Sequence, residues 1–130
     1  DIAKAKNIKR AIALSVSAPF HCPLMQPAAQ AMAEALAAVT IRPLAVPVLA
    51  NVIAAPEREP DHVRPLLVPQ VTNRVRWRES ILSLRDLGID ITVEFGGNKV
   101  LTGMVRRIDK ELQTVTLDTP ADLEAFGKSL

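Results

Sequence analysis

Aromatic residues are scarce in this 130-residue chain, which has three phenylalanines, one tryptophan and no tyrosine. A hydrophobic core must therefore be built from alanine, leucine, valine and isoleucine, because little aromatic surface is available for burial. The apolar fraction of 48% still favours a globular protein over a disordered one. The length suits one domain with a sizeable core.

Cysteine and net charge are also low. The single Cys22 excludes an intramolecular disulfide and suits a reducing compartment. A net charge of +2 gives no electrostatic reason to expect nucleic-acid binding. No apolar run is long enough to span a bilayer and no signal peptide is recognised, so we expect a cytoplasmic protein without membrane association. The chain begins at Asp1 without a methionine, and we expect an N-terminal portion to be missing.

Strand-like and helix-like apolar patterns alternate along the chain. Strands are expected at 11–16, 43–52, 90–95 and 114–118, and helices at 24–39, 61–71, 77–88, 99–112 and 120–130. An interior proline costs a helix roughly 3 kcal/mol, so the helix at 61–71 should be broken or irregular at Pro65 and Pro69. Residues 54–61 are expected to form a polar loop. The alternation indicates an α/β protein with a largely parallel sheet.

The segment SAPFHCPL places His21 directly after an expected strand and directly before an expected helix. Catalytic groups of α/β proteins gather at the C-terminal ends of strands, and histidine suits proton transfer near neutral pH. His21 is therefore either a general base or a structural histidine that hydrogen-bonds the adjoining loop. No serine lies in a GxSxG elbow, which excludes an independent serine hydrolase.

The remaining cysteine and histidine offer weaker candidate sites. Cys22 is adjacent to His21 in a stretch expected to be extended, where neighbouring side chains point to opposite sides, so a small buried apolar role is favoured over a thiol–imidazole pair. His62 lies among acidic residues whose spacing matches no metal site, and a solvated loop histidine is favoured. We expect no metal and no cofactor.

Two further motifs each allow two interpretations. The segment RVRWR directs Arg74, Arg76 and Arg78 to one side and Trp77 to the other, which suits either a nucleic-acid patch or a partly buried aromatic framed by solvated arginines. We favour the second. The segment GGNKVLTG at 96–103 is similar to a phosphate-binding loop, but it lacks both GxxxxGK[ST] and GxGxxG, and its glycines are explained by a turn.

Four segments, SVSAPFHCPLM, PVLANVIA, QVTNRVRW and VEFGGNKVLTGMVRRI, follow one another in the order found in a known family. Over residues 8–130 the sequence resembles the C-terminal half of the malonyl-CoA:acyl carrier protein transacylases of type II fatty acid synthesis. The resemblance implies that 1–17 end a ferredoxin-like small subdomain with its last strand. It also implies that 18–130 form the C-terminal part of an α/β hydrolase-like, parallel-sheet acyltransferase domain. The chain departs from the family at its glycine turn, which usually reads GPG.

The resemblance implies a transferase that moves a malonyl group from malonyl-CoA to the phosphopantetheine thiol of acyl carrier protein through an acyl-serine intermediate. His21 matches the general base, and Gln70 matches the residue whose main-chain carbonyl orients that base. Asn51 matches an asparagine near the substrate pocket. The serine, the carboxylate-binding arginine and the oxyanion-hole amides belong to the N-terminal half, so this fragment alone is expected to be inactive.

A second hypothesis is a non-catalytic α/β binding module. It would grip an acidic partner through an arginine-rich surface and would bind in a salt-sensitive way. The arginines concerned are Arg74, Arg76, Arg78, Arg106 and Arg107.

Overall fold

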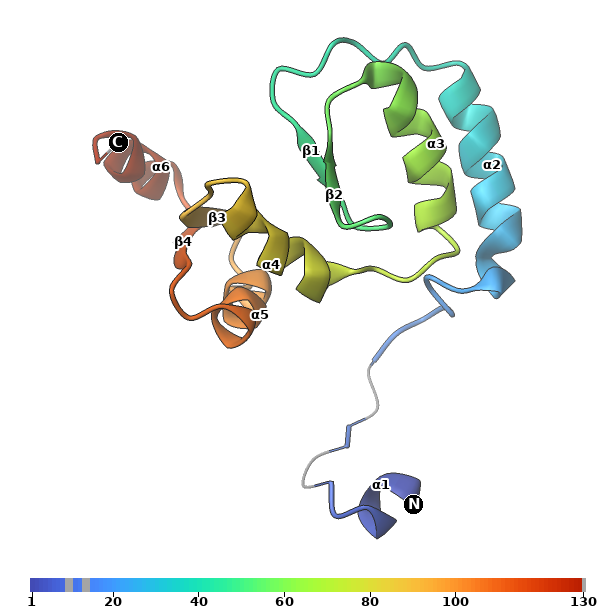
Figure 1. Ribbon diagram of the computed structural model, residues 1–130, viewed down its shortest axis with the longest axis horizontal. Helices are drawn as coiled ribbons and strands as arrows, with labels where there is room; N and C mark the ends of the chain where they lie inside the picture. Colours follow the sequence, from blue (N-terminus) through green and yellow to red (C-terminus); the bar gives the residue numbers. More distant parts are fainter. Residues whose placement is uncertain (9–10, 13–14, 130) are drawn as a thin grey trace.

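The computed structural model describes residues 1–8, 11–12 and 15–129. A short helix, α1 (Ile2–Ala5), lies away from the other elements (Figure 1). Of the strand expected at 11–16, residues 13–14 lie outside the described residues, and the other four positions are in no strand. The domain boundary at residue 17 therefore stays a prediction.

The first long helix follows His21. A 3₁₀ turn, η1 (Pro23–Met25), leads directly into α2 (Gln26–Ala37), which confirms the expected helix. Pro27 lies in the first turn, where its missing N–H removes no intrahelical hydrogen bond. Alanine, the best helix former, fills much of the remainder.

A short antiparallel hairpin follows α2. Strand β1 (Val48–Ala50) lies within the strand expected at 43–52 but is much shorter, and it pairs with β2 (Ala55–Glu57). The prediction of a loop throughout 54–61 was wrong, because β2 occupies part of it. Ala54 adopts a positive φ of 54° at the turn, and this brings the chain back along β1.

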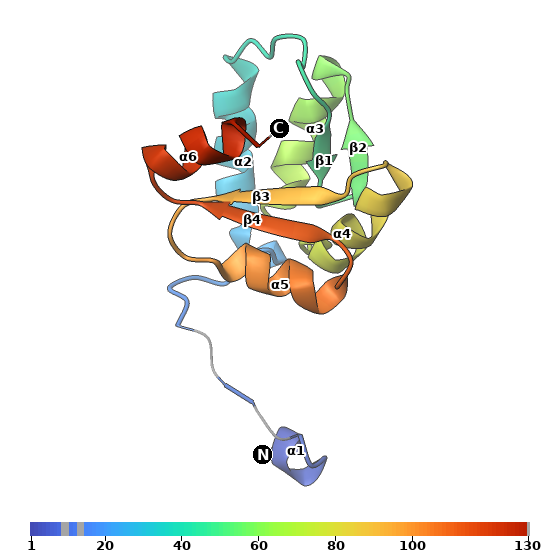
Figure 2. The same cartoon turned by 90° about the vertical axis from the view of Figure 1, so that its left-hand side faces the viewer.

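Helix α3 (Pro60–Gln70) confirms a helix at 61–71, and it is continuous, so the alternative of a helix broken at its prolines was wrong. Pro60 occupies its first turn, but Pro65 and Pro69 lie inside it and supply no main-chain donor. The helix packs beside α2 and the hairpin (Figures 1 and 2). Packing against these neighbours outweighs the local cost of the prolines.

Helices and strands alternate through the remainder of the chain. The elements are α4 (Trp77–Asp86), β3 (Ile91–Phe95), α5 (Val100–Ile108), β4 (Gln113–Leu117) and α6 (Pro120–Gly127). Strands β3 and β4 run parallel, with α5 as the crossover between them (Figure 2). All five elements were expected, although α5 ends earlier than predicted.

The ends of these helices follow from local sequence. Gly88, with φ 73°, ends α4 as predicted, because its N–H bonds the Arg85 carbonyl and the Ile89 N–H bonds the Leu84 carbonyl. At the start of α6, Thr119 and Asp122 form a reciprocal capping box.

The strands of the described residues form two separate two-stranded sheets, β1–β2 antiparallel and β3–β4 parallel. The α/β class is confirmed, whereas parallel pairing is confined to β3–β4. None of the helices described is long and apolar enough to cross a membrane.

The hydrophobic core lies in the C-terminal part. It consists of Ile81, Val105 and Leu112, with Trp77, Leu84 and Ile108 packed against it. Many large apolar side chains outside this core are exposed, including Leu24 at 75% and, at the end of β3, Phe95 at 73%. The accessible surface is 10061 Å², against about 6,700 Å² for a compact globular protein of this size.

Candidate functional site

His21 has an unusual backbone conformation. Its φ is 58°, in the left-handed region that residues with a Cβ seldom adopt. Histidine tolerates this region better than most, yet such conformations cost of order 1–3 kcal/mol and concentrate at functional sites. The strained residue lies two positions before η1, in the loop that leads into α2.

The ring of His21 contacts the end of α3. Its Nδ1 lies 2.8 Å from the main-chain oxygen of Gln70. A carbonyl oxygen can only accept, so Nδ1 carries the proton of a neutral ring and Nε2 keeps its lone pair. Gln70 is the last residue of α3, where a helical carbonyl lacks an intrahelical donor. The contact therefore selects one tautomer of His21 and leaves Nε2 able to accept a proton.

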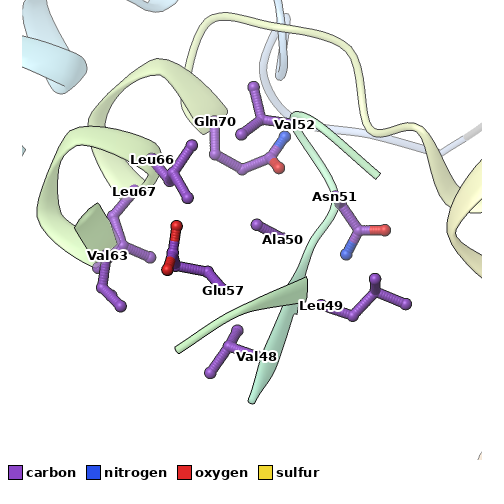
Figure 3. Close-up of a pocket in the computed structure, with 10 residues that line it drawn as sticks. All are labelled: Val48, Leu49, Ala50, Asn51, Val52, Glu57, Val63, Leu66, Leu67 and Gln70. Atoms are coloured by element: carbon purple, nitrogen blue, oxygen red, sulfur yellow. The ribbon is translucent and has the colours of Figure 1, made fainter. Parts of the chain in front are cut away.

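Asn51 directly follows β1 and is held by α4. Its side-chain Oδ1 accepts a hydrogen bond from Ser80 Oγ at 3.1 Å, and its main-chain oxygen accepts the Arg76 N–H at 3.0 Å. Ser80 is only 2% exposed. In Figure 3 the Asn51 side chain lies on the opposite side of the pocket from Val63. The structure thus shows Asn51 joining the hairpin to α4.

A pocket of about 190 Å³ lies between the hairpin and α3 (Figure 3). Its walls are mainly apolar, with Glu57, Asn51 and Gln70 as polar members. One residue, Gln70, therefore belongs both to the pocket lining and to the contact with the His21 ring. The His21 side chain is not part of its lining.

Glu57 and His62 form a separate local pair. His62 Nδ1 is 3.2 Å from Glu57 Oε2, and the histidine side chain is 65% exposed. The main-chain N–H of Glu59, and to a lesser extent that of Arg58, lower the pKa of the Glu57 carboxyl by donating to it at 2.8 and 2.7 Å. No group of three or more potential metal ligands occurs in the part of the chain described.

Cys22 does not pair with the adjacent imidazole. Its Sγ–H donates to the Pro19 carbonyl at 3.0 Å, and the residue is half-buried. The thiol therefore stabilises the loop that carries His21.

The arginines near α4 bind the protein's own groups. Arg74 and Arg76 contact the same carboxylate of Glu79 at 2.8 and 3.4 Å, and Arg76 also donates to the Ile53 carbonyl at 2.9 Å. Trp77 begins α4 and packs against the core. The structure therefore gives no support to an arginine surface reserved for an acidic partner.

The first N–H groups of α5, after the glycine turn, are already bonded to a carboxylate of the chain. The Glu94 carboxylate already accepts the N–H groups of Leu101 at 3.1 Å and Thr102 at 2.7 Å. These bonds, that of Thr102 above all, hold the pKa of Glu94 below its ordinary value. An anionic ligand would have to displace a carboxylate of the chain itself.

Comparison with known proteins extends these observations. No family model matches the chain. The chain is 39% identical over 130 residues to the malonyl CoA-acyl carrier protein transacylase of Bacillus subtilis. It is 41% identical over 122 residues to the protein of the same name from Salmonella typhimurium. The chain is homologous to part of a malonyl CoA-acyl carrier protein transacylase.

Solved structures agree with this assignment. The acyl-carrier-protein-S-malonyltransferase of Bartonella henselae superposes with a TM-score of 0.91 and 47% identity over 98% of this chain. A malonyl-transacylase solved in complex with a type II polyketide acyl-carrier protein superposes with a TM-score of 0.89 and 35% sequence identity. The chain spans 41% of each of these proteins, and 41% and 40% of the two curated transacylases. The family resemblance is confirmed, and so is the acyltransferase fold of these neighbours as an α/β structure, while the ferredoxin-like subdomain at 1–17 stays a prediction.

Sequence reasoning missed two residues of this candidate site. Ser80 fastens Asn51, and Asn73 donates from its side-chain Nδ2 to the Pro69 carbonyl at 2.9 Å, next to Gln70. An asparagine shortly after a helical segment is a recognised stop signal and could have drawn attention to Asn73. No local pattern marks Ser80, because its partner is 29 positions away.

Proposed function

We propose that this chain is the C-terminal portion of a malonyl-CoA:acyl carrier protein transacylase and that His21 is its general base. One observation carries the proposal: Nδ1 of His21 contacts the Gln70 main-chain oxygen at 2.8 Å. Such a contact is what a base needs, because it fixes the ring and directs the Nδ1 proton of a neutral imidazole to the carbonyl, so that the lone pair lies on Nε2. The names of the homologous transacylases supply the substrates, malonyl-CoA and acyl carrier protein.

In the proposed reaction Nε2 takes the proton of a serine hydroxyl as the oxygen attacks the malonyl thioester. As the carbon–sulfur bond breaks, Nε2 gives that proton to the departing sulfur, so coenzyme A leaves as a thiol and the malonyl group stays on the serine as an ester. The phosphopantetheine thiol of acyl carrier protein then attacks the ester, gives its proton to Nε2, and the serine recovers it. A positioned base contributes about 10²–10⁴-fold to such a step.

The Gln70 carbonyl would serve both states of the imidazole. It accepts the Nδ1 proton when the ring is neutral and still accepts it when the ring becomes positively charged. As the last residue of α3, Gln70 lies at the negative end of the helix dipole, which favours a nearby positive charge. The ring therefore keeps its orientation through the proton transfer.

The nucleophile must come from elsewhere, because the sequence has no GxSxG elbow. We propose that an N-terminal half supplies the serine, the arginine that binds the malonyl carboxylate and the oxyanion-hole amides. The chain has more accessible surface than a compact protein of its size, and it exposes many large apolar side chains. Both features support this proposal, because a self-contained protein buries more of its surface and more of its apolar side chains.

The test is serine acylation in the full-length protein that carries these residues. His21→Ala should slow formation of the malonyl-serine ester by about 10²–10⁴-fold, measured by rapid quench with labelled malonyl-CoA. His62→Ala is the matched control, because His62 is 65% exposed and does not line the pocket, although its partner Glu57 does. Unimpaired acylation by the His21 variant would remove the proposed base. Malonyl transfer by the present chain alone would show that no N-terminal serine is needed.

A further inference from the structure

The turn that follows α3 is held by unusually many hydrogen bonds to one carbonyl. The Pro69 oxygen accepts the main-chain N–H of Asn73 at 2.9 Å and the side-chain Nδ2 of the same residue at 2.9 Å. It also accepts the Thr72 N–H at 3.2 Å. In return, Gln70 Nε2 lies 3.4 Å from the Asn73 carbonyl. Asn73 and the last turn of α3 thus brace each other.

This bracing ends the helix at a point where it could continue. Val71, the residue after α3, still has helical dihedrals of −65° and −35°. A further turn would need the Arg74 N–H to bond the Gln70 carbonyl, and within the described chain no main-chain N–H does so. Asparagine favours local side-chain bonds over helix continuation, so Asn73 supplies the stop.

The chain beyond Asn73 leaves the helix in a fixed direction. The Arg76 N–H bonds the Asn51 carbonyl at 3.0 Å, which ties the end of the connection to the hairpin. Residues 73–76 therefore run from the end of α3 to the hairpin and do not add another turn to α3.

We propose that Asn73 is a positioning residue: it stops α3 at Gln70 and so keeps the Gln70 carbonyl available to His21. The carbonyl of a helical residue points along the helix axis toward the N–H four positions later. Another turn of α3 would bring the Arg74 N–H to the position that Nδ1 of His21 now occupies. The consequence for catalysis rests on the proposed function, but the effect on the His21 ring does not.

The test uses the full-length protein with ¹⁵N-labelled histidine. Asn73→Asp keeps the size of the side chain and removes its donor, whereas Asn98→Asp makes the same change at another exposed asparagine. Asn98 has no side-chain hydrogen bond among the described residues and lies in the 96–98 turn. The ring ¹⁵N shifts should show the Nδ1–H tautomer of His21 in the unaltered protein and in the Asn98 variant. The Asn73 variant should show a mixture with the Nε2–H form.

In kinetics, Asn73→Asp should lower kcat by up to about 100-fold and leave the KM for malonyl-CoA little changed, because the base is misplaced while the substrate still binds. Asn73→Ala removes the donor without adding charge and should act in the same direction, so it serves if the aspartate variant does not fold. If the two Asn73 variants show the same His21 tautomer as Asn98→Asp, the inference is overturned. A shifted tautomer supports it even where His21→Ala leaves acylation intact, which would count against the proposed function alone.

Discussion

The two parts of the chain joined by residues 73–76 are stabilised in different ways. In the described chain, the part before this connection has one buried apolar side chain, Ala29, and its characteristic contacts are hydrogen bonds to main-chain oxygens. The part after it contains the packed core around Ile81 and Val105. Packing is strong but has little directional preference, whereas hydrogen bonds depend on angle. The orientation of His21 is set in the hydrogen-bonded part.

The two parts are joined by a small polar contact. Ser80, on α4, donates to Asn51 at the end of β1, while Arg76 bonds the main chain of Asn51 and Ile53. The well-packed part therefore supports the hairpin that faces α3 and Gln70. Three substitutions examine this difference, beginning with the largest expected effect.

The core should dominate stability. Ile81→Ala removes a side chain that is 3% exposed and should lower the free energy of unfolding by about 2–5 kcal/mol, measured by urea denaturation. Leu82→Ala, on the same helix but 44% exposed, is the control and should cost much less. Equal losses from the two variants would mean that the core is not where the structure places it.

The link between the two parts should contribute less. Ser80→Ala removes a hydroxyl that lies 3.1 Å from Asn51 Oδ1 and 2.9 Å from the Arg76 carbonyl, and it should cost about 1–3 kcal/mol. Ser83→Ala, one turn later, removes only a bond to the Ser80 carbonyl within α4 and should cost less than the first variant. Amide hydrogen exchange should show increased opening at Asn51 in Ser80→Ala alone. Unchanged exchange there would argue against the link.

The smallest effect concerns pH. The hydrogen bonds from Thr102 and Leu101 lower the pKa of Glu94, so the folded state keeps this group ionised more readily than the unfolded state does. The resulting stabilisation is complete above about pH 4.5, the ordinary value, and is lost as pH falls through the lowered pKa. Glu94→Gln should flatten this part of the pH–stability curve, measured by denaturant unfolding at several pH values.

Glu124→Gln provides the control for Glu94. Glu124 lies on α6, and no hydrogen bond to its side chain occurs in the described part of the chain. Its substitution should leave the acid slope in place. If both variants kept the same slope, the contact between Glu94 and the start of α5 would not be the cause.

Local patterns were sufficient for most of the elements. The helical spacing at 24–39, the glycine stop at Gly88 and the strand at 90–95 each depend on interactions within a few residues. The failures were non-local. Continuity of α3 through Pro65 depends on packing beside α2, and β2 exists because β1 offers it a pairing edge.

The candidate site divides in the same way. A histidine between a strand-like and a helix-like run, together with the order of four family-like segments, pointed to His21, and the resemblance supplied Gln70 and Asn51. Neither indicated how Asn73 or Ser80 would contribute, because their effect comes from the contacts that they make in the folded chain.

The sequence by itself determined the alternation of helices and strands, the absence of a serine elbow and the likeness to one acyltransferase family, since these are properties of residue type and order. The resemblance implied that the Gln70 carbonyl orients His21, but only the tertiary structure decided the geometry of that contact, with Nδ1 at 2.8 Å from an oxygen 49 positions away. That contact requires α3 to end at Gln70 beside the loop before α2. The physical reason is that hydrogen-bond direction depends on where two distant backbone segments come to rest, which no local pattern encodes.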